Sequence, residues 1–396
     1  MKGKHLPCLL WLGSWLLVVV SVFMPFKAQA GNDTLHLFSA GEGGYHTYRI
    51  PAIVTTVKGT LLAFCEGRKD GPHDAGNIDI VLKRSTDGGR TWSKVMVIWS
   101  DSTNTCGNPC PVVDGVTGAI WLLMTHNLGS DKEGDLIRRT AQSSRTVWAA
   151  KSEDDGLGWS VPVNVTNSAK DTSWGWYATG PGIGIQVQYG PYKGRLIVPC
   201  DHGYADANGR LKGGYEYGAH VIYSDDHGVT WQKGGVIRPK VNECQVTELA
   251  DGKGGLLMNM RSYFGHGCRT HAVSHDGGGN WSAPEDVSGL EDPVCQASII
   301  RYTWPVKKHA GCLLFLNPAS KNKRDNMTLK ASTDEGRMWR QVQLLYAGPS
   351  AYSCMALLPH GEVVCLYEAG EREPYEVIVL QRIDKKTITR IVKNRG

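Results

Sequence analysis

Short apolar or alternating segments, separated by turn residues, follow one another along most of the chain. Examples are residues 78–82 (IDIVL), 195–198 (RLIV) and 255–260 (GLLMNM). Runs of this length bounded by Gly, Pro, Asn and Asp are typical of β-strands. No long segment after the N-terminal region has helical periodicity, and the 48 glycines suit a chain rich in turns. The pattern therefore predicts an all-β protein.

One motif, Ser-x-Asp-x-Gly-x-x-Trp, occurs five times. Its Asp can accept hydrogen bonds from the backbone of its own turn, its Gly supplies a positive φ, and its Trp buries a large apolar face. We interpret the motif as a hairpin tip with a structural role. The copies begin at Ser85, Ser152, Ser224, Ser274 and Ser332.

The spacing of the motifs indicates how many units the chain contains. Successive motif aspartates are 67, 72, 50 and 58 residues apart, so residues 31–396 hold about six units. A unit of this length fits four strands, and four-stranded sheets repeated radially form a propeller. We therefore predict one domain with the fold of a six-bladed β-propeller. The unit without a motif combines the C-terminal strands with a first strand near residues 35–38, which closes the ring.

The N-terminal 30 residues have the pattern of a secretory signal peptide. Lys2 and Lys4 precede an apolar run over residues 8–24, and residues 28–30 (AQA) supply small side chains for cleavage. The run is also long enough for a retained membrane anchor, but Pro25 and the cleavage site favour removal. We expect export through the secretory pathway to an extracellular, periplasmic or lysosomal location, with no stable membrane span in the mature chain.

Charge and cysteine content narrow the picture further. Cleavage removes three lysines and lowers the net charge from +5 to about +2, which gives no bulk attraction for nucleic acid. Ten cysteines remain, and an exported protein can form disulfides. Cys106 and Cys110 are a plausible pair, whereas Cys65, Cys354 and Cys365 lie in strand-like runs typical of buried thiols.

Among the residues outside the motifs, three arginines are candidates for a common site. Arg49 lies in a Tyr-Arg-Ile-Pro sequence, and Arg261 and Arg324 lie beside later strand-like runs. Each alone is usually a surface residue, but on three blades of one ring they would meet near the axis. Three guanidinium groups around one site require an anion, and their planar fork matches a carboxylate best.

These arginines, the Tyr-Arg-Ile-Pro sequence and the repeated motifs resemble the exo-α-sialidase (neuraminidase) family of bacteria and animals, over nearly all of residues 31–396. The resemblance implies a retaining glycosidase that removes terminal sialic acids from glycoproteins, gangliosides and oligosaccharides without a cofactor. It also implies that Arg49, Arg261 and Arg324 hold the sialic acid carboxylate.

The family's nucleophile is a tyrosine, and Tyr352 lies in a similar setting, residues 348–353. The anomeric carbon of sialic acid bears a carboxylate, which would repel a carboxylate nucleophile. A neutral phenol needs a base, and Glu243 matches the family's partner glutamate. Glu248 is the alternative in the same segment. The two would face opposite sides of a strand, so only one can reach the tyrosine.

Other residues match supporting positions of the family. Asp74, ten residues before Arg84, resembles the acid/base that protonates the leaving oxygen and then deprotonates water. The alternative is a turn-forming aspartate. Glu368 resembles the glutamate that orients the first arginine, and Glu66 and Arg68 match a rim element near the acetamido group.

One segment departs from the family pattern. Some animal members place two tyrosines after a Val-Pro strand end, where they meet the glycerol tail, but here residues 200–203 read CDHG. Tyr204 is out of phase, and Tyr215 and Tyr217 are possible substitutes. Linkage and glycerol-tail preference therefore stay open.

Alternative interpretations exist for the function and for one segment. A trans-sialidase or anhydro-forming lyase shares these residues, whereas a non-catalytic sialic-acid-binding propeller would lack the Tyr, Glu or Asp.

A metal site is the less favoured interpretation of one histidine-rich segment, because its spacing also fits strand alternation. That segment contains His266, Cys268, His271 and His275.

Overall fold

The computed structural model describes residues 1, 3, 34–205 and 215–393. Apart from residues 1 and 3, the predicted signal peptide lies outside these residues, as does its cleavage site. Within the described ranges, no helix has the length and apolar character needed to cross a membrane.

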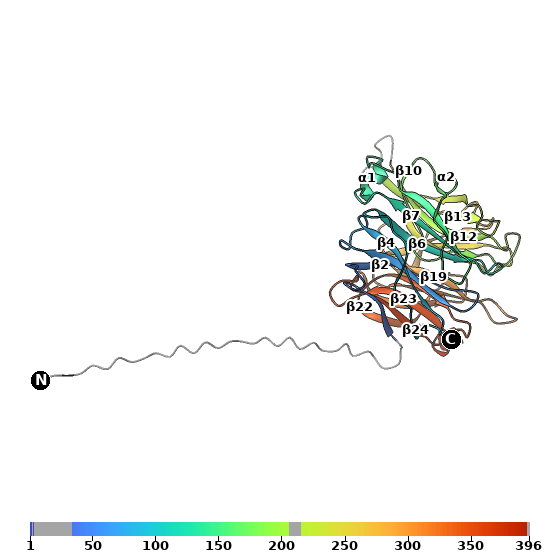
Figure 1. Cartoon of the computed structure of the whole chain (residues 1–396). Helices are drawn as coiled ribbons and strands as arrows, with labels where there is room; N and C mark the ends of the chain where they lie inside the picture. Colours follow the sequence, from blue (N-terminus) through green and yellow to red (C-terminus); the bar gives the residue numbers. More distant parts are fainter. Residues whose placement is uncertain (2, 4–33, 206–214, 394–396) are drawn as a thin grey trace. The chain divides into compact units, whose positions relative to one another are not determined.

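The described residues fold almost entirely into β-strands (Figure 1). In chain order these strands can be divided into six sets of four antiparallel strands, apart from one short extra strand and one parallel bridge, Ile78 to Thr105, between the first two sets. The first three sets are β2 (Thr47–Thr55), β3 (Leu61–Arg68), β4 (Ile78–Ser85) and β5 (Met96–Trp99); β6 (Thr105–Val113), β7 (Ile120–Asn127), β8 (Thr146–Ser152) and β9 (Val163–Asn164); and β10 (Trp174–Thr179), β12 (Leu196–Ala205), β13 (Tyr215–Ser224) and β14 (Gln232–Ile237), with β11 (Ile185–Gln186) beside β12.

The later sets continue in chain order until the last one, which returns to the N-terminal strand. They are β15 (Val241–Glu248), β16 (Leu256–Ser262), β17 (Cys268–Ser274) and β18 (Glu285–Glu291); β19 (Ser298–Thr303), β20 (Cys312–Pro318), β21 (Asp325–Ser332) and the first part of β22 (Arg340–Leu357); and the rest of β22, β23 (Val363–Ala369), β24 (Val377–Ile383) and β1 (Thr34–Ser39).

The pairing of β1 with β24 agrees with the predicted sixth unit. The two strands run antiparallel, with Phe38 opposite Ile378. In the other five sets the Ser-x-Asp-x-Gly-x-x-Trp motif joins the third strand to the fourth. In this set the third and fourth strands are β24 and β1, which lie at opposite ends of the sequence, so no motif connects them. The sixth set therefore explains why six units carry only five motifs.

The five motifs have the structural role that the sequence predicts. In every copy the Ser hydroxyl donates to the Asp carboxylate at 2.7–2.9 Å. The same hydroxyl accepts the Gly N–H at 2.7–2.9 Å. Each of these glycines has a positive φ between 78° and 91°. The motifs thus fix hairpin tips and carry no group that faces the cavity described below.

Short helices also occur, although the sequence pattern predicts none. α1 (Glu133–Arg138) and α2 (Thr166–Ala169) lie in connections between strands, and α3 (Lys385–Lys393) follows β24. The Asp384 carboxylate accepts the Thr387 N–H at 2.9 Å and caps the start of α3. Ile388 of this helix is buried. Such short helices have too few turns to give a clear periodicity.

The predicted pairing of Cys106 with Cys110 is wrong. Both lie on β6 and both are free thiols, like the other cysteines of the described residues. Cys106 packs in a cluster with side chains of β3 and β4, whereas Cys110 packs in another cluster with side chains of β10 and β12. The strand therefore directs the two sulfurs into different parts of the core.

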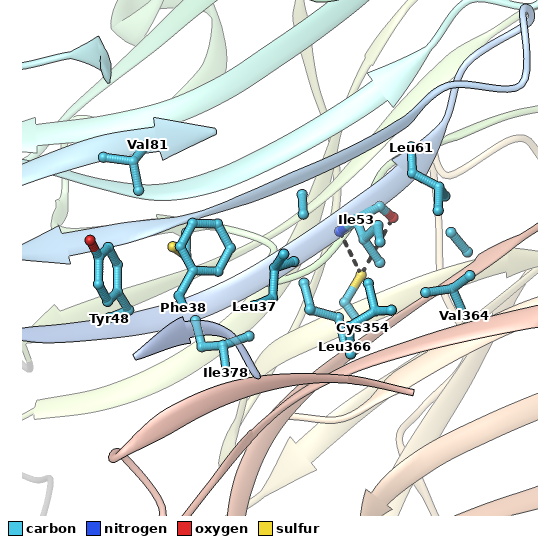
Figure 2. Close-up of a cluster of buried hydrophobic side chains, with 14 of the residues drawn as sticks. Leu37, Phe38, Tyr48, Ile53, Leu61, Val81, Cys354, Val364, Leu366 and Ile378 are labelled. Atoms are coloured by element: carbon cyan, nitrogen blue, oxygen red, sulfur yellow. Dashed lines mark hydrogen bonds between the residues drawn. The ribbon is translucent and has the colours of Figure 1, made fainter. Parts of the chain in front are cut away.

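The first and last sets pack against each other through a continuous apolar cluster (Figure 2). Ile53 of β2 lies beside Cys354 of β22, and the Ile53 N–H donates to the Cys354 sulfur at 3.3 Å. Figure 1 shows the same arrangement, with β2 in blue next to the red strands β22–β24. Residues far apart in sequence, at the start of β2 and in β22 and β23, are thereby placed side by side.

Hydrogen bonds also connect each remaining set to the next. The bonds are Asn108 N–H to Glu66 Oε1, Thr179 Oγ1 to Asn108 O, Cys244 N–H to Gly180 O, Arg301 Nη2 to Glu248 O, and Ser353 N–H to Gln296 Oε1.

We expect Gly228→Ala to destabilise the fold more than an ordinary glycine substitution. Gly228 has a φ of +90°, and a Cβ there would lie 2.1 Å from Trp121 Nε1. Left-handed backbone costs a non-glycine residue about 1–2 kcal/mol, and overpacking adds about 1–3 kcal/mol. Gly252→Ala is the matched control, since Gly252 has a φ of +68° with no atom near the added Cβ. Urea unfolding that gives equal losses for the two variants would contradict the packing argument.

Candidate functional site

One cavity of about 310 Å³ receives side chains from all six sets of strands. Eight of the nine site residues predicted from the sequence line this cavity. The ninth, Glu368, does not line it but contacts two residues that do, Arg49 and Tyr352. The eight are Arg49, Glu66, Arg68, Asp74, Glu243, Arg261, Arg324 and Tyr352.

Glu368 connects the first and last sets beneath the cavity. Its side chain is fully buried. Oε1 accepts the Arg49 Nε–H at 2.7 Å and the Ile50 N–H at 2.9 Å, while Oε2 accepts the Tyr352 N–H at 3.1 Å. One carboxylate therefore fixes the backbone beside both Arg49 and Tyr352.

Three of the cavity side chains lie at irregularities in strand pairing. The register shifts between Arg49 and Ala52 in β2, between residues 241 and 244 in β15, and between residues 350 and 353 in β22. Such bulges turn a strand and redirect its side chains. They occur at Arg49, Glu243 and Tyr352, so the local backbone directs these three groups toward the cavity.

Tyr352 and Glu243 are in direct contact. The Tyr352 hydroxyl donates a short hydrogen bond to Glu243 Oε1. Arg261 Nη1 donates to Glu243 Oε2 at 2.7 Å and to the Tyr352 hydroxyl at 3.3 Å. Burial and the nearby Glu243 carboxylate raise the pKa of Tyr352 well above its usual range, against the opposing effect of the arginines. The phenol is therefore neutral and bonded to an acceptor.

The alternative glutamate, Glu248, lies elsewhere. Its carboxylate accepts the backbone N–H groups of Gln188 at 2.6 Å and Tyr189 at 2.9 Å, and it does not line the cavity. The geometry thus separates the two glutamates that the sequence leaves open.

The other two arginines complete a cationic wall around the phenol. The guanidinium carbons of Arg49 and Arg324 lie 5.1 and 5.8 Å from the centre of the Tyr352 ring. Together with Arg261 they place three positive charges in one small, largely buried space. An arrangement of this kind binds an anion, and a carboxylate matches the guanidinium geometry.

Asp74 lies at the mouth of the cavity. Its side chain is 64% exposed, and its Oδ1 is 2.8 Å from Arg68 Nη1 and 4.0 Å from Arg49 Nη1. Partial burial raises the pKa of Asp74, but the charges of Arg68 and Arg49 outweigh this and lower it below its usual value. Arg68 is itself held by Glu66, whose Oε2 lies 2.6 Å from Arg68 Nη2. This exposed carboxylate can exchange protons with a ligand in the cavity.

Several other residues that line the cavity could not be selected from the sequence. They include Glu133 of α1 and Tyr217, whose hydroxyl donates to Glu133 Oε1 at 3.0 Å. Buried Arg145 lies 4.1 Å from the centre of the Trp176 ring. These residues occur singly in unremarkable segments, so no local pattern singles them out. Of these residues the sequence indicates only Tyr217, as a possible substitute for the family's tyrosines.

Asp201 is the most unusual of the residues that line the cavity. It is 1% exposed, and neither of its carboxyl oxygens has a hydrogen-bond partner among the described residues. Burial raises the pKa of Asp201 well above its usual range, and the neighbouring Glu243 and Glu133 carboxylates act in the same direction. These surroundings favour the neutral form of the Asp201 carboxyl group. In the sequence this position was noted only as a departure, at residues 200–203.

The histidine-rich segment of the fourth set lies outside the cavity. His266 Nδ1 is 2.5 Å from the Asp286 carboxylate, and His271 Nε2 is 3.8 Å from Glu285. Cys268 and His271 belong to β17, as the strand-alternation interpretation predicts. None of these residues is among those that line the cavity.

The fold and the cavity define an all-β protein whose repeated sheets contribute side chains to one cavity lined by arginines. Residues 59–365 match a family described as BNR repeat-like domain. The chain is 34% identical over 340 residues to the sialidase of Micromonospora viridifaciens, which covers 83% of this chain. It is 32% identical over 355 residues to the sialidase of Bacteroides fragilis, which covers 84% of it. The chain belongs to the BNR-repeat sialidase family.

Solved structures agree with this placement. The Hadza microbial sialidase Hz136 superposes with a TM-score of 0.75 at 30% identity, covering 88% of this chain and 67% of that one. The leech intramolecular trans-sialidase, solved with 2,7-anhydro-Neu5Ac, gives a TM-score of 0.74 at 20% identity, covering 91% and 72%, and supports the fold alone. The chain spans 51% of the Micromonospora relative and 61% of the Bacteroides relative.

We expect Asp201→Asn to change how stability depends on pH. Above about pH 4 the unfolded state releases the Asp201 proton while the folded state retains it, so the wild type loses stability as pH rises. The variant lacks this group. Its free energy of unfolding relative to the wild type should increase by about 1.4 kcal/mol per pH unit above pH 4, until the folded-state pKa is reached. Urea titrations at pH 4.5 and 7.5 measure the effect, and parallel pH profiles would show that Asp201 is not protonated.

Proposed function

We propose that this protein is a retaining exo-α-sialidase that hydrolyses terminal α-linked sialic acids. The observation that carries the proposal is the Tyr352 hydroxyl, bonded to Glu243 and surrounded by three arginines, in a chain of the sialidase family. The proposal includes a closed six-bladed propeller, because hydrogen bonds connect each set of strands to the next and β1 completes the last one.

The arginines bind the substrate through its carboxylate. Arg49, Arg261 and Arg324 would surround the carboxylate on the anomeric carbon and place that carbon above the Tyr352 hydroxyl. Because the arginines are held by other groups before the ligand arrives, such as Glu368 for Arg49 and Glu243 for Arg261, little ordering is required on binding.

Tyr352 then attacks the anomeric carbon. As its oxygen forms the new bond, its proton passes to Glu243, to which it is already hydrogen-bonded. Activation of this kind is necessary because the raised pKa of Tyr352 keeps the free phenol protonated. The bond to the leaving oxygen breaks at the same time, and a glycosyl-tyrosine intermediate results.

Asp74 serves the leaving group. In the free protein Arg68 and Arg49 lower the pKa of Asp74 and favour its ionised form. A bound carboxylate would offset the charge of Arg49, so the pKa of Asp74 rises when substrate binds. The protonated acid then donates to the leaving oxygen. In the second step Asp74 takes a proton from water, water attacks the anomeric carbon, and Glu243 returns the proton to Tyr352, which gives net retention.

The proposed substrates are glycoproteins, gangliosides and oligosaccharides that end in sialic acid. We also propose that residues 1–30 direct export and are removed, and that residues 31–396 form the catalytic domain. The charged N-terminus, apolar run and small cleavage residues support this. Sequencing the N-terminus of protein secreted from its host tests the cleavage.

The reaction itself is tested by identifying the released sugar. Purified protein is incubated with 3′- and 6′-sialyllactose, a sialylated glycoprotein and a ganglioside. Free sialic acid, released first as the α-anomer, supports the proposed hydrolase. A 2,7-anhydro sugar would identify an intramolecular trans-sialidase, transfer to added lactose would identify a trans-sialidase, and no release would leave a binding protein.

We expect Tyr352→Phe to abolish efficient turnover while preserving binding. The substitution removes the attacking oxygen and leaves the arginines in place. The value of kcat should fall by about 10³-fold or more, since general-base and nucleophilic assistance are both lost. Calorimetry with 2-deoxy-2,3-didehydro-N-acetylneuraminic acid should give a Kd within about threefold of the wild type. Near-normal turnover of sialyllactose by this variant would exclude Tyr352 as nucleophile.

The role of Asp74 predicts a dependence on the leaving group. Asp74→Asn should lower kcat/KM for 3′-sialyllactose by about 10²–10⁴-fold, because an alkoxide leaves poorly without an acid. An aryl sialoside with an acidic phenol needs less protonation, so its kcat/KM should fall by about tenfold or less. Asp70→Asn is the control, since Asp70 lies in the same loop and does not line the cavity. Equal losses for both substrates would contradict the assignment.

A further inference from the structure

Tyr375 contacts two of the three cavity arginines, although the sequence analysis did not select it. Its ring centre lies 4.0 Å from the guanidinium carbon of Arg49. Its hydroxyl accepts a hydrogen bond from Arg324 Nη1 at 2.8 Å. The side chain lines the cavity beside Tyr352. One aromatic residue therefore orients guanidinium groups that come from two different sets of strands.

The loop that carries Tyr375 is held in a defined conformation. It connects β23 to β24, and its first residue is anchored where the Gly370 N–H donates to Pro349 O at 3.1 Å. The neighbouring Glu376 carboxylate closes the turn by accepting three backbone N–H groups. The donors are Glu371 and Arg372, both at 3.0 Å, and Glu373 at 3.2 Å.

The Tyr375 hydroxyl can still donate a hydrogen bond. A phenol can accept a hydrogen bond and donate one. The bond from Arg324 uses an acceptor position, and none of the described residues accepts the Tyr375 proton. The Tyr375 hydroxyl contacts Arg324, and its ring contacts Arg49. A carboxylate bound by these two arginines can therefore accept the hydroxyl proton of Tyr375.

We propose that Tyr375 is a fourth contact for the substrate carboxylate, donating its hydroxyl proton to the anion while its ring and oxygen orient Arg49 and Arg324. The proposal rests on the proposed sialidase function and deepens it. A purely structural role is the competing explanation, because the Tyr375 ring also packs against a small cluster that contains Ile50, Cys295 and Ala351. The two explanations differ in whether the effect of the hydroxyl depends on the ligand's negative charge.

Tyr375→Phe separates them, because it removes the hydroxyl and retains the ring over Arg49. Binding is measured by calorimetry with 2-deoxy-2,3-didehydro-N-acetylneuraminic acid and with its methyl ester, which lacks the charged carboxylate. We expect the variant to bind the acid about tenfold more weakly, as for loss of a hydrogen bond to a charged group, and the ester within about twofold of the wild type. KM for sialyllactose should rise similarly, with kcat changed by less than about threefold.

Two further variants complete the test. Tyr302→Phe is the matched control, because the Tyr302 hydroxyl donates to Gly361 O at 2.9 Å and does not line the cavity; it should leave both affinities unchanged. Tyr375→Leu also removes the stacking on Arg49, so it should weaken binding of the acid more than Tyr375→Phe does. It also serves as the test if the Phe variant does not fold.

The outcomes are distinct. Equal weakening of acid and ester, or no weakening of either, would overturn the role of Tyr375. If the wild type binds the acid but releases no sialic acid from sialyllactose, the proposed hydrolysis fails while the carboxylate contact is still measured. If the wild type binds neither ligand, both proposals are wrong.

Discussion

A single buried carboxylate, that of Glu368, determines the geometry on which the cavity depends. It accepts hydrogen bonds from the Arg49 side chain and from the backbone beside it, and from the backbone of Tyr352. Isolated in the core, such a charge would be costly, but three donors satisfy it and one of them is cationic. The same interaction joins the first and last sets of strands. The contact between these two sets and the alignment of Arg49 with Tyr352 thus depend on the same carboxylate.

The remaining cavity groups follow from irregularities in an otherwise regular scaffold. The Asp motifs repeat the same hairpin tip five times, while bulges redirect Arg49, Glu243 and Tyr352. The repeated hairpin tips stabilise the scaffold, and the bulges place polar side chains at the cavity. The cavity is also lined by Asp201, a buried carboxyl group whose oxygens have no hydrogen-bond partner among the described residues.

Much of this arrangement could be predicted from the sequence. The strand pattern and the motif spacing gave the sets of strands, because hairpin tips depend on local residues. The charged residues Arg49, Arg261, Arg324, Glu243 and Glu368 could be chosen because they match a family pattern. The rest depends on contacts across the fold. Tyr375 and Asp201 resemble ordinary loop and strand residues until distant segments meet around them, and Cys106 and Cys110 are close in sequence yet face different clusters.

The pairing of β1 with β24 has a consequence for biosynthesis. The ribosome synthesises β1 and β2 first and β24 almost last. The strand β1 therefore has no pairing partner until translation of residues 34–396 is nearly complete. During that time Arg49 has no carboxylate beneath it, and the nascent chain cannot assemble the cavity. Any shortened product that ends before β24 would lack this last pairing and would leave the edge of β1 without its neighbouring strand.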